Sequence, residues 1–349
     1  METVFDIFSD DAFSLESMTD AISKIDHVPG QCGALTFQGN GVGVSTTKVV
    51  IESRNQTLAI IPTSPRGAPA PQEKRDKRTM VEVVLPQIKL EETIGAHSIQ
   101  NVRQSGTGNV LADVMSVVNE QLVKMTSRID LTLEHMRLGA IKGKVLDADG
   151  SVLLDLFDLF GVAEPAVATF TTAAGSLRPG IMGVKRTVER NAKTLLPPGA
   201  QVRALCSPAF FDEFTSHDDV AQAFAGWQAA QQNLAGDVRA GFNFGDVIWS
   251  EYRGTDGIDG EESSDGALIG EVGLAAGTCR FFLTGVPGIY TEKFAPADFL
   301  DSVNRPGLPR YARVAVDPEM SRWAKIHVQS NPMPICLRPE TLIEGTFDN

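Results

Sequence analysis

The chain has 349 residues, of which 42% are hydrophobic and 21% are charged, a composition typical of soluble globular proteins with two or three domains. Lys and Arg number 31 against 44 Asp and Glu, a net charge of −13, which argues against a dedicated nucleic-acid-binding protein because an acidic chain repels phosphate. No stretch approaches the roughly 20 apolar residues of a membrane span, and the N-terminus lacks the pattern of a signal peptide.

Residues 1–44 are predicted to form an N-terminal arm. Phe5, Phe8 and Phe13 are apolar anchors among acidic residues and candidates for contact with another subunit that the arm reaches, and a short amphipathic helix follows them. The glycine-rich GALTFQGNGVG then indicates a connector with few side chains for a core. Its GNGVG lacks the preceding strand of a dinucleotide loop and the Gly-Lys-Ser/Thr of a Walker loop, so we interpret it as a flexible hinge.

Residues 45–94 are predicted to form a long β-hairpin. Two runs of alternating apolar residues flank a tip rich in proline and charge, PTSPRGAPAPQEKRDKR. A two-stranded ribbon of this length is marginal alone in water. We therefore expect it to lie along another surface. The basic tip residues are candidates for contact with an acidic neighbouring subunit, although a solvated loop tip explains them equally well: Arg66, Lys74, Arg75, Lys77 and Arg78.

Residues 107–138 carry apolar side chains at helical spacing and predict a long helix that Gly139 ends. After it, Asp147-Ala-Asp149-Gly150 lies between two apolar runs and predicts a hairpin turn. Residues 166–300 mix helices and strands, with Ser207-Pro208 predicted to start one helix. The proline-rich residues 301–349 are expected to return to the domain of the long helix.

Sequence motifs typical of catalytic or metal-binding sites are weak in this chain. The DADG turn lacks the further ligands of a calcium loop, and the acidic run at 256–265 is more typical of a solvated loop than of a cation site. The five histidines are scattered, and no catalytic motif surrounds any of them. The four cysteines form no CxxC pair, which favours reduced thiols over a zinc site: Cys32, Cys206, Cys279 and Cys336. We predict no catalytic, cofactor-binding or metal-binding residues.

Several segments, in order over nearly the whole chain, resemble the lambda-type bacteriophage capsid protein E family. They include GALTFQGNGVGVSTTKVVIE, EKRDKRTMVEVVLPQIKLEETIGAHSIQNVR, DLTLEHMRLGAIKGKVLDADGSVLLDLFDLFGV and GVPGIYTEKFAPADFLDSVNRPGLPRYAR. Each is modestly specific, but their joint order is strongly specific. Residues 165–250 match least distinctly.

The resemblance implies the α+β tailed-phage major capsid fold. Its parts would be the N-arm 1–44, an extended E-loop 45–94, a P-domain 95–165 with the long spine helix, an A-domain 166–300, and a return to the P-domain. It also implies hexamers and pentamers closing into an icosahedral shell around double-stranded DNA. The implied partners are a portal protein, a scaffold protein and, in many relatives, a decoration protein. The protein would be assembled in the host bacterial cytoplasm and end in the virion.

Two alternatives stay open. The first is an encapsulin-like compartment of the same fold, which would enclose a cargo protein and no DNA. The second is a cytosolic α/β enzyme, which would need a deep polar pocket and a functional histidine. Neither the shell size nor any cross-linking residue follows from the sequence.

Overall fold

The computed structural model describes residues 18–19, 30–54, 78–95, 110–171, 175–193, 196–221, 223–224, 241–252, 273–320 and 322–348. For residues 52–54, 78–79 and 110–116 it describes the backbone only. The chain divides into two compact units. Unit 1 comprises residues 1–49, 84–134 and 292–334; unit 2 comprises 50–83, 135–291 and 335–349.

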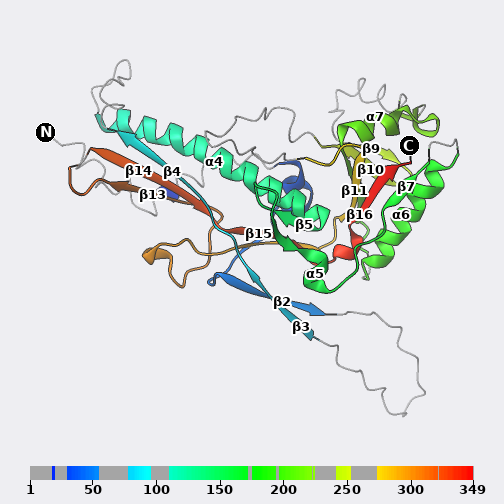
Figure 1. The fold of residues 1–349 in the computed structure, drawn as a ribbon, viewed down its shortest axis with the longest axis horizontal. Helices are drawn as coiled ribbons and strands as arrows, with labels where there is room; N and C mark the ends of the chain where they lie inside the picture. Colours follow the sequence, from blue (N-terminus) through cyan, green and yellow to red (C-terminus); the bar gives the residue numbers. More distant parts are fainter. Residues whose placement is uncertain are drawn as a thin grey trace, which may run out of the picture. The chain divides into compact units, whose positions relative to one another are not determined.

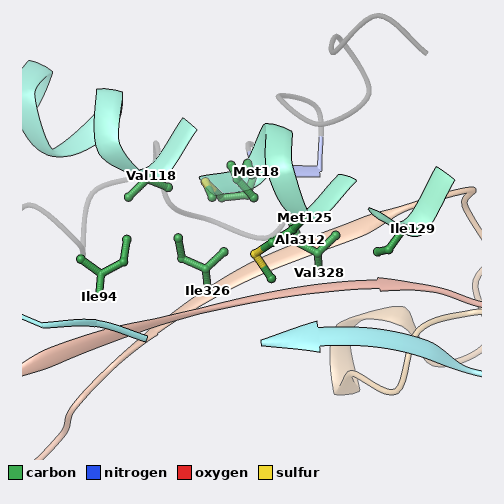
Figure 2. Close-up of a cluster of buried hydrophobic side chains, with 9 residues drawn as sticks. Met18, Ile94, Val118, Met125, Ile129, Ala312, Ile326 and Val328 are labelled. Atoms are coloured by element: carbon green, nitrogen blue, oxygen red, sulfur yellow. The ribbon is translucent and has the colours of Figure 1, made fainter. Parts of the chain in front are cut away.

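Unit 1 is built from a long helix lying on a three-stranded antiparallel sheet. The helix is α4 (Val110–Lys142), which belongs to unit 1 up to Glu134, and the sheet has the order β13 (Tyr311–Val316), β14 (Trp323–Ser330), β4 (Ile88–Gly95) (Figure 1). Figure 2 shows the side chains that fill the space between them. This buried cluster consists of Met18, Ile94, Val118, Leu122, Met125, Ile129, Ala312, Ile326 and Val328.

The end of α4 differs from the sequence prediction. Gly139 does not stop the helix, which continues to Lys142 and ends where Gly143 adopts φ +93°. Gly139 serves packing instead, because a Cβ there would lie 2.8 Å from the carbonyl oxygen of Lys144. The predicted start at 107–109 lies outside the described residues.

The predicted hinge before the hairpin is folded. Residues Gly33–Phe37 form a π-helical turn, and β1 (Gly41–Gly43) pairs in parallel with β12 (Tyr290–Phe294) in a sheet completed by β15 (Pro332–Cys336). Val44 N donates to Phe294 O at 2.9 Å. The hinge interpretation was wrong because glycine in this segment allows close backbone approach rather than motion.

Unit 2 contains a six-stranded mixed sheet. Its order is β7 (Ala168–Phe170), β16 (Ile343–Phe347), β11 (Thr278–Thr284), β8 (Gln201–Cys206), β10 (Val247–Glu251), β9 (Phe242–Phe244). Pairs β16–β7 and β10–β8 are parallel, and the other pairs are antiparallel. Helices α6 (Leu177–Asn191) and α7 (Pro208–Ser216) pack against it (Figure 1).

Two sequence predictions are confirmed in unit 2: the start of a helix at Ser207 and the hairpin turn at 147–150. The Ser207 side chain accepts a hydrogen bond from Phe210 N at 3.4 Å and caps α7, with proline at its first position. The hairpin of β5 (Lys144–Leu146) and β6 (Val152–Asp155) turns at 147–150, where Gly150 N donates to Asp147 O at 3.0 Å. A short helix, α5 (Leu156–Phe160), follows.

Two strands lie elsewhere than the sequence placed them. The predicted hairpin 45–94 is interrupted at Pro86: β2 (Lys48–Arg54) pairs with β3 (Arg78–Val84), whereas β4 pairs with β14. Strand β16 lies inside the six-stranded sheet and not with the sheet of the long helix. In both cases the strand partner is far away in sequence, and alternation along one strand does not name its partner.

Candidate assembly surfaces

The β2–β3 pair, here called the ribbon, has one buried and one exposed side. On the buried side Ile51 and Val83 are 8% and 2% exposed. On the other side Val50, Met80 and Val84 are 60%, 70% and 62% exposed. Since successive strand residues face opposite ways, Lys48 and Glu82 share this exposed side, which is therefore a mixed surface with three large apolar side chains. Such a surface is typical of a protein interaction site.

The contact residues predicted from sequence lie almost entirely outside the described part of the chain. Arg78 is the first residue of β3, described by its backbone only. The others fall in ranges that the structure does not describe: Phe5, Phe8, Phe13, Arg66, Lys74, Arg75 and Lys77. Their contacts therefore stay predictions.

The described parts of the arm pack on their own chain. Met18 belongs to the core of unit 1, and the Thr19 hydroxyl accepts from Ala312 N at 3.5 Å. Met18 and Thr19 therefore lie on their own subunit, whereas contacts of residues 1–17 with another subunit stay a prediction.

Glu134, on α4, binds the start of the π-helical turn through two backbone groups. Its buried carboxylate accepts from Cys32 N at 2.6 Å and from Gly33 N at 3.0 Å. Helix starts leave such N–H groups without partners, and a carboxylate is their favoured acceptor. Nothing in the local sequence linked a helix glutamate to a segment about 100 residues earlier.

A second exposed apolar surface lies in unit 1, between β12 and β13. Its loop is firmly held: the Ser302 hydroxyl bonds two loop carbonyls at 2.7 and 2.9 Å, and Arg310 donates to both carboxylate oxygens of Asp130 at 2.6 Å. The loop nevertheless exposes two large apolar side chains, Leu300 at 91% and Val303 at 60%. The sequence analysis missed this surface, although leucine and valine in a proline-rich run were a signal.

An open groove of about 740 Å³ lies in unit 1 between α4 and β4. Charged side chains of both signs line it, together with Val123, which is 45% exposed. On its strand side, Glu91 accepts from Lys325 and pairs with His327, both at 3.0 Å. These partners lower the pKa of Glu91, with the Lys325 hydrogen bond as the largest cause. The groove is an open, amphipathic channel rather than an enclosed pocket.

The described residues that the sequence analysis considered as candidate metal ligands or catalytic groups do not lie together in a site. Within the described ranges, no three metal-ligating side chains lie together, and the acidic run 256–265 lies outside those ranges. Asp147 and Asp149 of the DADG turn bind the turn's own backbone N–H groups at 2.7 and 2.8 Å. His135 belongs to α4, where burial lowers its pKa, followed by the charge of Lys142. None of the helices searched, in the described part of the chain, could cross a membrane.

Comparison with known proteins identifies the architecture. The phage major capsid protein E family matches residues 14–347. The chain belongs to this family. It is 22% identical to the major capsid protein of Salmonella phage Felix O1, over 95% of this chain and 96% of the relative. It is 31% identical to the major capsid protein of Pseudomonas phage KPP10, over 41% of this chain and 42% of the relative.

The fold is also shared with a solved structure. The crystal structure of a protein assigned as a prophage capsid protein in E. coli CFT073 superposes with a TM-score of 0.59 at 12% identity, covering 96% of this chain and 99% of the other. The predicted α+β tailed-phage capsid fold is therefore confirmed. As a phage major capsid protein, the chain is a structural subunit that assembles into a shell and is a component of the virion.

Proposed function

We propose that copies of this chain form hexamers and pentamers of an icosahedral head that encloses double-stranded DNA, with the ribbon of each copy lying across its neighbour. The observation that carries this proposal is the pair of large apolar side chains on the exposed side of the ribbon, Val50 at 60% and Met80 at 70% exposed. A two-stranded ribbon is marginal in water, so covering this side by another subunit stabilises both partners. Burying one such side chain contributes about 1.5–3 kcal/mol.

The groove between α4 and β4 is the surface that we assign to receive the neighbour's ribbon. It is open, it exposes Val123 among charged residues, and it lies on the well-packed part of unit 1. Ribbon and groove are different surfaces, so the contact is head-to-tail, and such contacts close into rings only at the correct rotation. Many weak contacts of this kind add up in a shell.

The net charge of −13 supports a container wall. A wall of subunits with net negative charge does not hold packaged DNA by its phosphates, so DNA is enclosed without sequence-specific binding. The basic tip of the hairpin, between β2 and β3, then meets an acidic neighbour. A portal protein, a scaffold protein and a decoration protein complete the proposed set of partners, with assembly in the host bacterial cytoplasm.

The test is particle formation by the purified chain, observed by electron microscopy. We expect Met80→Asp and Val123→Asp to abolish shells. The first places a charge on the ribbon and the second places one in the groove, so both disturb the same proposed contact. Val152→Asp is the matched control: Val152 is also exposed, at 57%, but lies on β6 outside both surfaces.

Deleting residues 64–78 should likewise leave a folded subunit that forms no particles. Circular dichroism and size-exclusion chromatography would establish that each variant folds. Intact shells from Met80→Asp or from the deletion would refute the role of the ribbon, and intact shells from Val123→Asp alone would refute only the assignment of the groove.

A further inference from the structure

Two cysteines that are distant in sequence lie opposite each other in the centre of the unit 2 sheet. Cys206 is the last residue of β8, and Cys279 is its register partner on the antiparallel strand β11. Both are fully buried, and both are free thiols. Directly opposed residues of an antiparallel pair point to the same face of the sheet. The topology therefore brings together two thiols that the sequence separates.

The hydrogen-bond pattern shows which kind of pair they form. The Cys206 carbonyl accepts from Tyr252 N at 2.9 Å, on the opposite side from β11, whereas Ser207 N donates to Thr278 O at 3.0 Å. Ser207 and Thr278 are therefore the hydrogen-bonded pair, and the two cysteines are the adjacent non-hydrogen-bonded pair. In such pairs the Cα atoms are about 4.5 Å apart, within the roughly 4.4–6.8 Å that a disulfide requires.

The surroundings give the sulfur atoms room on this face. Gly345 is the register partner of Cys279 on β16, and a Cβ at Gly345 would lie 2.7 Å from the Cys279 sulfur. The sulfur thus occupies space that any other residue at 345 would fill. Burial raises the pKa of the Cys279 thiol, and its hydrogen bond with the Cys206 thiol raises it further. Since the thiolate is the reactive form, oxidation in the closed core is slow and follows local opening.

We propose that Cys206 and Cys279 form a cross-strand disulfide when the protein passes from reducing to oxidising surroundings. A low-molecular-weight disulfide such as oxidised glutathione is the oxidant. One cysteine thiolate attacks it, forms a mixed disulfide and releases one glutathione. The other thiolate attacks the protein sulfur of that mixed disulfide, closes the Cys206–Cys279 bond and releases the second glutathione. Two protein thiols are oxidised, and the oxidant is reduced to two thiols that take up the two protons.

The bond would tie together β8 and β11, which adjoin each other in the middle of the sheet. It would close a loop of 72 residues, 279 − 206 − 1, which contains α7, β9 and β10. Closing a long loop restricts the unfolded chain and stabilises the fold. The shell subunit would thus gain stability after leaving a reducing compartment. The inference depends only on the sheet of a single chain, so it stands or falls separately from the ribbon contact.

The chain supplies its own controls. Cys32 and Cys336 are also fully buried and form no disulfide, but no described strand register pairs either of them with a cysteine. Burial raises the pKa of Cys336 to about 12. If burial alone decided reactivity, all four thiols would respond alike.

The test oxidises the full-length, purified and reduced chain with oxidised glutathione for days, slightly below its unfolding temperature so that the core opens repeatedly. Remaining thiols are blocked with N-ethylmaleimide in denaturant at mildly acidic pH, and the unreduced digest is analysed by mass spectrometry. We expect one Cys206–Cys279 cross-linked peptide pair, with Cys32 and Cys336 alkylated. The unfolding midpoint should rise by roughly 5–10 °C and return to its starting value on reduction.

Variants separate this disulfide from any other effect of the oxidant. Cys206→Ser should abolish the rise in midpoint, whereas Cys336→Ser should preserve it; Cys206→Ala replaces the serine variant if the hydroxyl prevents folding. Four alkylated cysteines, glutathione retained on Cys206 or Cys279, or a cross-link to Cys32 or Cys336 would each overturn the proposal.

Discussion

The six-stranded sheet and the ribbon use large apolar side chains in opposite ways. In the sheet, Trp249 is fully buried, stacks on Phe214 at 4.1 Å between ring centroids, and donates through its indole nitrogen to Phe244 O at 3.0 Å. In the ribbon, Met80 is 70% exposed. The sheet satisfies its own residues within one chain, whereas the ribbon presents apolar surface that one chain leaves in water. The same residue chemistry therefore stabilises the subunit in one place and, in our proposal, serves assembly in the other.

The largest expected effect separates these two roles directly. Phe214→Ala should lower the free energy of unfolding of the subunit by about 3–5 kcal/mol, because it removes a fully buried ring from a packed aromatic cluster. Met80→Ala should change it by less than about 0.5 kcal/mol, because the side chain is mostly exposed in the subunit. Denaturant unfolding of the unassembled chain measures both.

Similar losses of stability in Phe214→Ala and Met80→Ala would contradict the contrast between the packed sheet and the exposed ribbon. It is sharpened if Met80→Ala leaves the subunit unchanged while raising the concentration at which particles form. Phe214→Ala would then lower the yield of folded subunit without a separate effect on assembly.

A smaller effect is expected where the arm meets α4, a region that is neither core nor exposed ribbon. Glu134→Ala should destabilise the subunit by about 2–3 kcal/mol, because it leaves the buried N–H groups of Cys32 and Gly33 without their acceptor. Glu134→Gln, which keeps one carbonyl oxygen of similar reach, should cost about half as much. Hydrogen exchange at these two amides is the specific readout.

Unchanged exchange at Cys32 and Gly33 in Glu134→Ala would show that the carboxylate does not hold the turn. Faster exchange confined to these two amides would show that the turn at Cys32 and Gly33 is held by packing within the subunit, unlike the exposed side of the ribbon.

The smallest expected effect concerns pH. Burial lowers the pKa of His135 below its ordinary value in the folded chain, with the charge of Lys142 as the next cause and the Asp147 backbone opposing both. Between the folded and unfolded pKa values, the unfolded state binds the proton and the folded state does not, so stability falls as pH drops through this window. Above the unfolded pKa the contribution is fully present.

His135→Gln should flatten this part of the stability profile, measured as the difference between variant and wild type from neutral to mildly acidic pH. Parallel stability profiles for His135→Gln and the wild type would show that His135 does not cause this pH dependence. The ribbon has no histidine in its described strands, so Met80→Ala provides the control whose profile should follow the wild type.

The sequence predicted those parts of the fold whose signals are local. The long helix followed from apolar spacing, the turn at 147–150 from its Asp and Gly residues, and the start of α7 from Ser207-Pro208. The end of α4 was missed because Gly139 can be placed inside a helix by close packing against Lys144. The folded segment 30–44 was missed because its composition is that of a linker, although Phe37 is 2% exposed.

The ribbon was predicted, but with the wrong extent. Alternation located the ribbon, but it could not show that β4 leaves at Pro86 to pair with β14, since pairing is decided by tertiary packing. The opposed pair Cys206 and Cys279 escaped for a similar reason: motif searches examine short spacings, and a register between distant strands has no short spacing to find.

The exposed turn between β5 and β6 has a practical consequence for labelling the particle. Asp147 and Asp149 satisfy the turn's backbone groups from within, and residues 147–151 are all exposed. A foreign peptide inserted after Asp149 therefore disturbs no described core side chain, because loop tips of this kind accept added chain. Of the features described, this turn is the natural position for an epitope or affinity tag carried in many copies.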